Sequence, residues 1–199
     1  ADETIGMFRR FQWDITGRVT FDGENCLAIE IIPPGLLPDE PYKTKQMEAT
    51  TGWDDHNPQP PDANMGIWQS VYIRHTGPVK ILNPFVLTDL SVPDMEKADL
   101  SVLATVTNCS QEPVSAVVSG QIGKVTFNKA VFLNAGDSQD VRFAADEFPQ
   151  LRFENPRVWW PHPLGKQELY VLKLAVDTKG RLSDSVSTTF GIRKITSVI

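Results

Sequence analysis

The sequence predicts an all-β protein, and three observations lead to this fold class. Apolar residues recur at every second position in many short runs, which is the period of a half-buried strand. No window of helical length keeps the i, i+3, i+4, i+7 spacing of an amphipathic helix. Turn-forming residues separate the runs at short intervals. We therefore expect short strands joined by turns, with one face of each strand directed to a core.

The composition is that of an ordinary folded protein and excludes several function classes. The 199 residues are 41% hydrophobic and 22% charged, which is too apolar for a disordered chain. The net charge is -6 and the basic residues are scattered, so neither nucleic acid nor an anionic membrane is an expected partner. Apolar stretches stop well short of the roughly 20 residues of a membrane span, and no signal peptide is expected. Cys26 and Cys109 predict neither a disulfide nor a Cys-based metal site.

The first 77 residues contain only three predicted strands. They are 7–13, 26–32 and 66–74, and the second carries Leu27, Ile29 and Ile31 on one face. A long proline-rich stretch, 33–62, separates the last two, and such stretches are usually functional or disordered. Because three strands bury little area, we expect residues 1–77 to be part of a larger β-domain or to lean on the next one.

The remaining residues, 78–199, predict an immunoglobulin-like β-sandwich. About seven short strands fit between Pro84 and Arg193, which is the count and spacing of such a fold. Alternating runs are clearest in 100–106, 125–133, 170–176 and 186–192. The turns predicted in and before the sandwich are Asp22-Gly23, Asn83-Pro84, Val92-Pro93-Asp94, Asn134-Ala135-Gly136-Asp137 and Lys179-Gly180.

Several motifs, in this order along the chain, resemble those of a known family. Gly6-Met7-Phe8-Arg9-Arg10-Phe11 and Asn25-Cys26-Leu27 resemble late strands of a sugar-binding jelly roll. Gly52-Trp53-Asp54 and Asn64-Met65-Gly66-Ile67-Trp68 resemble the end of that jelly roll. Trp159-Trp160-Pro161, Leu169-Tyr170 and Phe190-Gly191-Ile192-Arg193-Lys194 resemble the end of an immunoglobulin-like domain. The family is glycoside hydrolase family 2, in its branch of β-mannosidases, exo-β-glucosaminidases and endo-β-mannosidases.

The resemblance implies a truncated jelly-roll (galactose-binding-like) segment at 1–77 and the immunoglobulin-like domain at 78–199. Family members hydrolyse β-glycosides with retention, using two glutamates on a (β/α)₈ barrel that follows this domain. The sequence contains no βα repeats that predict such a barrel. We therefore interpret the chain as a non-catalytic fragment of a β-mannoside or β-glucosaminide hydrolase. Its expected partners are its own barrel domain and the carbohydrate substrate, and no cofactor or metal is expected.

The resemblance places substrate contacts on the loop around Trp53 and Asp54, with Asn64 nearby. An ionised Asp54 would accept hydrogen bonds from two adjacent sugar hydroxyls and so orient the ring. The alternative is an ordinary loop Asp that caps a turn. Trp53 would stack on a sugar or pack the loop onto the sheet, and Asn64 would approach the active site or serve as a turn residue.

Other candidate residues have simpler interpretations. Asp54-Asp55-His56 cannot converge on one metal ion, because successive side chains of an extended chain point in alternating directions. Trp159 and Trp160 are expected to pack, since prolines follow them beside a strand. Asn108-Cys109-Ser110 matches the N-glycosylation sequon. For the whole chain, the alternative is a free-standing carbohydrate-binding or adhesive β-sandwich protein without an enzymatic parent.

Overall fold

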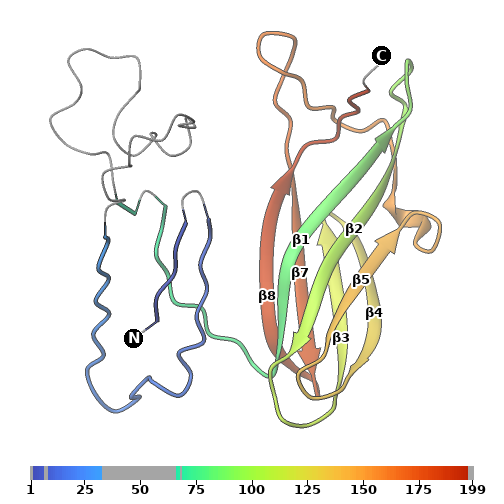
Figure 1. The fold of residues 1–199 in the computed structure, drawn as a ribbon. Coiled ribbons are helices and arrows are strands. Elements are labelled where there is room, and N and C mark those ends of the chain that lie inside the picture. Colours follow the sequence, from blue (N-terminus) through green and yellow to red (C-terminus); the bar gives the residue numbers. More distant parts are fainter. Residues whose placement is uncertain (1, 7–8, 33–65, 68, 197–199) are drawn as a thin grey trace, which may run out of the picture. The chain divides into compact units, whose positions relative to one another are not determined.

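The computed structural model describes residues 2–6, 9–32, 66–67 and 69–196 (Figure 1). The chain divides into two compact units, Ala1–Tyr72 and Ile73–Ile199. Among the described residues, no helix is both long enough and apolar enough to cross a bilayer.

The second unit is an antiparallel β-sandwich of two four-stranded sheets (Figure 1). One sheet has the order β1-β2-β5, with β6 also paired to β2, and the other has the order β4-β3-β7-β8. The elements are β1 (Val79–Leu90), β2 (Lys97–Asn108), β3 (Val114–Ile122), β4 (Val125–Leu133), β5 (Ser138–Ala144), the 3-10 helix η1 (Pro149–Leu151), β6 (Arg152–Glu154), β7 (Tyr170–Thr178) and β8 (Arg181–Phe190). The predicted all-β class and β-sandwich are confirmed.

The core lies between the sheets and is formed by alternate residues of each strand. On β2, every second residue from Ala98 to Val106 is buried. On β7 the buried alternate residues are Leu172, Leu174 and Val176. Burying a Leu, Ile or Val side chain stabilises a fold by roughly 1.5–3 kcal/mol, so the alternation read from sequence is also the main source of stability. It fixes the register as well, because a one-residue slip would expose the whole row.

The turn predicted at Asn83-Pro84 is wrong, because both residues lie within β1. The pairing with β2 shifts register between Leu82 and Phe85, and Asn83 has a positive φ of 51°. Proline cannot donate to a sheet ladder, and a bulge at this point lets the strand continue to Leu90. The other predicted turns of the sandwich do separate consecutive strands.

The first unit has no assigned strand among its described residues, so the strand predicted for 26–32 is not formed. The turn predicted at Asp22-Gly23 is present, and the Asn25 side chain braces it through both backbone groups of Thr20. Leu27, Ile29 and Ile31 are 66%, 50% and 48% exposed. A strand needs a hydrogen-bonded neighbour and a buried face. Within the described residues, this segment has no assigned strand partner and is exposed along its whole length.

Candidate functional site

The residues predicted to contact substrate, Trp53, Asp54 and Asn64, lie outside the described residues. Their roles therefore stay predictions. In the part of the chain that the structure describes, no group of three or more His, Cys, Asp or Glu side chains could hold a metal ion. The best-defined polar cluster lies where residues 73–78, the connector, join the sandwich. We define the connector site as Arg74, Gly77, Ser183 and Asp184.

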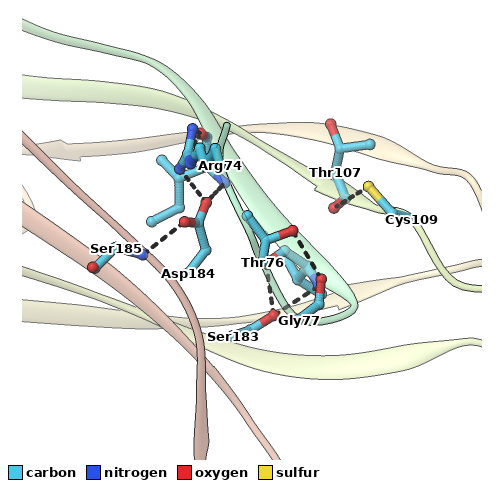
Figure 2. Close-up of polar contacts among 10 residues, drawn as sticks. Arg74, Thr76, Gly77, Thr107, Cys109, Ser183, Asp184 and Ser185 are labelled. Atoms are coloured by element: carbon cyan, nitrogen blue, oxygen red, sulfur yellow. Dashed lines mark hydrogen bonds and ion pairs between the residues drawn. The ribbon is translucent and has the colours of Figure 1, made fainter. Parts of the chain in front are cut away.

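Asp184 of β8 is the buried carboxylate of the connector site (Figure 2). Its Oδ2 accepts hydrogen bonds from the Ile81 backbone N–H at 2.7 Å and from the Arg74 guanidinium. Its Oδ1 accepts from the Ser185 N–H at 2.8 Å. Arg74 also donates to the Ile81 carbonyl at 3.3 Å. A charge that is 5% exposed is tolerated only when it is paired and hydrogen-bonded, and this one is both.

Ser183 holds the rest of the connector site together. Its Oγ accepts from the Val79 N–H at 2.8 Å and donates to the Val79 carbonyl at 2.7 Å. Its carbonyl accepts from the Gly77 N–H at 2.6 Å. A Cβ at Gly77 would lie 2.7 Å from Ser183 Oγ and 3.0 Å from Ser183 Cα. Glycine is therefore required for the connector to lie this close to β8.

A bulge in β8 explains why two consecutive polar side chains are buried. Val176 pairs with Asp184 and Asp177 pairs with Leu182, so Ser183 is an extra residue on β8. In a regular strand successive side chains point to opposite faces, whereas the extra residue re-aims one of them. Both side chains thereby bond backbone groups of β1, which has no strand partner on that edge of its sheet among the described residues.

This arrangement anchors the chain and supplies no acid-base group. A general base needs a lone pair directed at a substrate proton, whereas the oxygens of Asp184 are committed to Ile81, Arg74 and Ser185. The connector site is a structural joint. Sequence reasoning missed it, although a Ser-Asp pair in an otherwise alternating strand was a signal that a bulge and a buried polar contact occur there.

A surface groove of about 370 Å³ brings two other carboxylates together. Asp89 of β1 and Asp99 of β2 are directly opposite each other in the sheet. Asp89 pairs with Lys194 at 2.9 Å, and Arg152 donates two hydrogen bonds to Asp99 at 2.7 and 2.8 Å. The hydrogen bond from Arg152 holds the pKa of Asp99 below its ordinary value. A general acid needs a raised pKa, so these carboxylates do not form a glycosidase pair.

Trp159 packs against the sandwich, as expected, whereas Trp160 is 36% exposed. The backbone N–H of Trp159 donates to the Ile192 carbonyl at 2.9 Å, and the Arg193 guanidinium lies 4.8 Å from the Trp159 ring centroid. Gly191 lies so close to Trp159 that a Cβ there would approach the ring to 2.8 Å. Trp160 packs in the same manner on Gly165. The contacts with Gly191 and Arg193 cover part of the Trp159 ring, a surface that a sugar platform would need free.

The asparagine of the N-glycosylation sequon is also structural. Asn108 is fully buried, and its Nδ2 donates to the carbonyls of Glu112, Leu133 and Asn134. Its Oδ1 accepts from both the N–H and the hydroxyl of Ser110. The neighbouring Cys109 is exposed, and its thiol contacts the Thr107 carbonyl (Figure 2). A glycan on Asn108 would displace hydrogen bonds that close the ends of β2 and β4.

A protein-family model matches the sandwich, and known proteins are similar to nearly the whole chain. The model of the glycosyl hydrolases family 2 matches residues 79–193. An exo-β-D-glucosaminidase of Streptomyces avermitilis is 37% identical over 193 residues, which are 97% of this chain and 20% of that protein. A mannosylglycoprotein endo-β-mannosidase of Lilium longiflorum is 32% identical over 98% of this chain and 22% of that protein.

A solved structure gives the same result for the fold. The crystal structure of the exo-chitosanase CsxA of Amycolatopsis orientalis is 33% identical, with a TM-score of 0.61 over 68% of this chain and 15% of that chain. The present chain thus spans about a fifth of the length of the curated relatives that it matches.

Proposed function

Because the chain belongs to the glycosyl hydrolases of family 2, we propose that it is a non-catalytic part of a retaining β-glycosidase. The observation that carries the proposal is the family match across the sandwich, residues 79–193. The relatives named above are glycosidases about five times longer than this chain, since the chain covers 20% and 22% of them. Most of the length of such an enzyme is therefore available for a separate catalytic domain.

In this proposal the two parts of the chain have different tasks. Residues 1–77 are the C-terminal part of a sugar-binding jelly-roll domain and carry the substrate loop with Trp53, Asp54 and Asn64. Residues 78–199 are the sandwich that supports a (β/α)₈ barrel. The exposed row Leu27, Ile29 and Ile31 supports the first assignment, because an alternating apolar row is normally buried in a complete sheet.

The connector site supports a positioning role for the sandwich. The connector begins nine residues after Asn64, and Arg74 and Gly77 are bonded to β8. The chain that leaves the proposed substrate loop is therefore held at a defined point of the sandwich.

Hydrolysis itself would come from groups outside this chain. Retention requires two carboxyl groups about 5–5.5 Å apart, one acting as acid and base and the other as nucleophile. Asp89 and Asp99 are both ion-paired, and the lowered pKa of Asp99 is opposite to what an acid requires. We assign both catalytic roles to glutamates on the barrel, and to this chain the support of the barrel and part of the substrate pocket.

Among substrates, we favour a β-glucosaminide over a β-mannoside. The exo-β-D-glucosaminidase of Streptomyces avermitilis is 37% identical to this chain, against 32% for the endo-β-mannosidase of Lilium longiflorum. The matched crystal structure is that of an exo-chitosanase. The net charge of -6 is compatible with a cationic amino-sugar substrate, since charge complementarity raises the local substrate concentration.

The test compares the 199-residue chain with the complete protein to which it belongs, on aryl β-D-glucosaminides and aryl β-mannosides. We expect no release of the aryl group by the chain alone. We expect the complete protein to prefer the glucosaminide and to form the β-anomer first, which NMR of the initial product detects. Turnover by the chain that is lost in Asp89→Asn or Asp99→Asn would refute the non-catalytic assignment. A complete protein without a barrel would favour the free-standing carbohydrate-binding alternative.

A further inference from the structure

Lys129 is an inward-facing lysine on an edge strand of the sandwich. It lies on β4 between Phe127 and Val131, which are 3% and 7% exposed and face the core. By the alternation of the strand, Lys129 shares their face. Its side chain is 32% exposed, so the ammonium reaches solvent only at the margin of the core. A partly buried charge lowers the stability of the fold unless it is paired or hydrogen-bonded. The presence of a lysine at this position therefore needs an explanation.

The ammonium of Lys129 has partners on β5 of the opposite sheet and in the turn that follows it. It donates to the Arg142 carbonyl of β5 at 3.0 Å and to the Glu147 carboxylate at 2.7 Å. It also lies 5.7 and 5.6 Å from the ring centroids of Phe143 and Phe148. One side chain thus spans the gap between the two sheets and covers an aromatic part of the core.

The two strands that Lys129 joins are the edges of their sheets. In the part of the chain that the structure describes, β4 and β5 each have a strand neighbour on one side only, and both lie on the same side of the sandwich (Figure 1). The opposite side is closed by Ser183 and Asp184. On the β4–β5 side, the outward carbonyls of Thr126 and Arg142 accept from Gln150 and Lys129. Side chains therefore occupy backbone groups that a further strand would otherwise use.

We propose that Lys129 prevents the β4–β5 side of the sandwich from pairing with the same side of a second copy of this chain. A second copy is the occupant that this edge fits, because two identical edge strands can pair antiparallel about a twofold axis. The neighbouring outward residue Phe132 is 63% exposed and would gain burial in such a pair. Pairing would also seal the Lys129 ammonium from water and displace it from the Arg142 carbonyl, and this cost opposes association.

The test uses the 199-residue chain and the variant Lys129→Met, which keeps the length of the side chain and removes its charge. Sedimentation velocity over a range of protein concentrations measures self-association, and amide hydrogen exchange locates it. We expect self-association at least about tenfold tighter than in the wild type, with new protection in residues 125–133 and 138–144. If Lys129→Met loses its cooperative melting transition, Lys129→Gln replaces it, and the same increase in self-association and the same new protection are expected.

Two control variants separate the edge effect from a general loss of charge. Lys124→Met removes an exposed lysine in the turn before β4 and should associate no more than the wild type. Lys129→Arg keeps an inward charge and should also behave as the wild type. A folded Lys129→Met chain with unchanged self-association would overturn the proposal. So would association whose new protection lies only in other parts of the chain.

Discussion

Single polar side chains form hydrogen bonds with backbone N–H and C=O groups of this sandwich that no neighbouring strand pairs in the described structure. Asp184 and Ser183 bond the N–H groups of Ile81 and Val79 at the free edge of β1. Asn108, the last residue of β2, donates to the carbonyls of Glu112, Leu133 and Asn134. An unpaired backbone group that is buried costs about 1–3 kcal/mol, so each of these side chains stabilises the fold through the groups it satisfies.

Replacing Asp184 with alanine should cost about 3 kcal/mol or more in the free energy of unfolding. The substitution leaves the Arg74 guanidinium without its carboxylate and the buried N–H of Ile81 without an acceptor. Urea denaturation followed by tryptophan fluorescence measures the change. Asp146→Ala is the matched control, because that carboxylate is 70% exposed and only 3.4 Å contacts join it to Arg142. Similar losses in the two variants would contradict the role of the connector site.

At the scale of elements, bulges explain most of what the sequence analysis did not foresee. The alternation predicted β2, β4 and β7 well, because their buried rows are regular. In β1 and β8 an extra residue shifts the alternation, at Asn83-Pro84 and at Ser183. A local pattern does not distinguish a turn from a bulge at Asn83-Pro84, since the distinction depends on whether β2 continues opposite both halves of the strand.

The short strand β6 shows how a charge pair supports a weak element. It has three residues and pairs with β2 from Lys97 to Asp99. Arg152 of β6 donates two hydrogen bonds to Asp99 of β2, the residue opposite it in the ladder. Because the side chain of Asp99 is 42% exposed, solvent screening keeps the contribution of the pair to about 0.5 kcal/mol.

The contribution of the Asp99–Arg152 pair should depend on pH. The hydrogen bond from Arg152 lowers the pKa of Asp99 in the folded state below its ordinary value of 3.8. Its stabilisation is therefore complete above that ordinary value and is lost as the pH falls through the lower folded-state pKa. Urea titrations of wild type and Asp99→Asn should differ by about 0.5 kcal/mol at pH 7 and converge in acid. A difference that does not change with pH would show that the charge is not its source.

At the scale of the whole molecule, the sequence analysis identified the fold class and the family but not the contact that holds the connector on the sandwich. Alternation and turn residues suffice for an antiparallel sandwich, and the motifs from Trp159 to Lys194 suffice for the family. The contact between Arg74 and Asp184 joins residues 110 positions apart, and no local pattern encodes such a separation. The proposed substrate residues were reached only through the family resemblance, because a loop Asp and Trp carry no periodic signal.

The proposed function makes Asp54 its most informative residue. In the complete glycosidase, a carboxylate that holds two sugar hydroxyls would supply charge-assisted hydrogen bonds of roughly 1.5–3 kcal/mol each. Loss of both leaves the hydroxyls unpaired in a pocket from which water is excluded. The effect would therefore fall on catalysis, while an exposed loop carboxylate would add little to folding stability.

Asp54→Ala in the complete enzyme should lower kcat/KM on an aryl β-D-glucosaminide by on the order of 10²-fold or more, since each 1.4 kcal/mol is about tenfold. Its melting temperature should stay close to that of the wild type. Asp55→Ala is the control, because adjacent side chains of an extended loop point in opposite directions and only one of them can face the sugar. Steady-state kinetics and thermal melts of the two variants distinguish the alternatives. Equally small kinetic losses would make Asp54 an ordinary turn residue, whereas a large drop in melting temperature with unchanged kinetics would make it a structural cap.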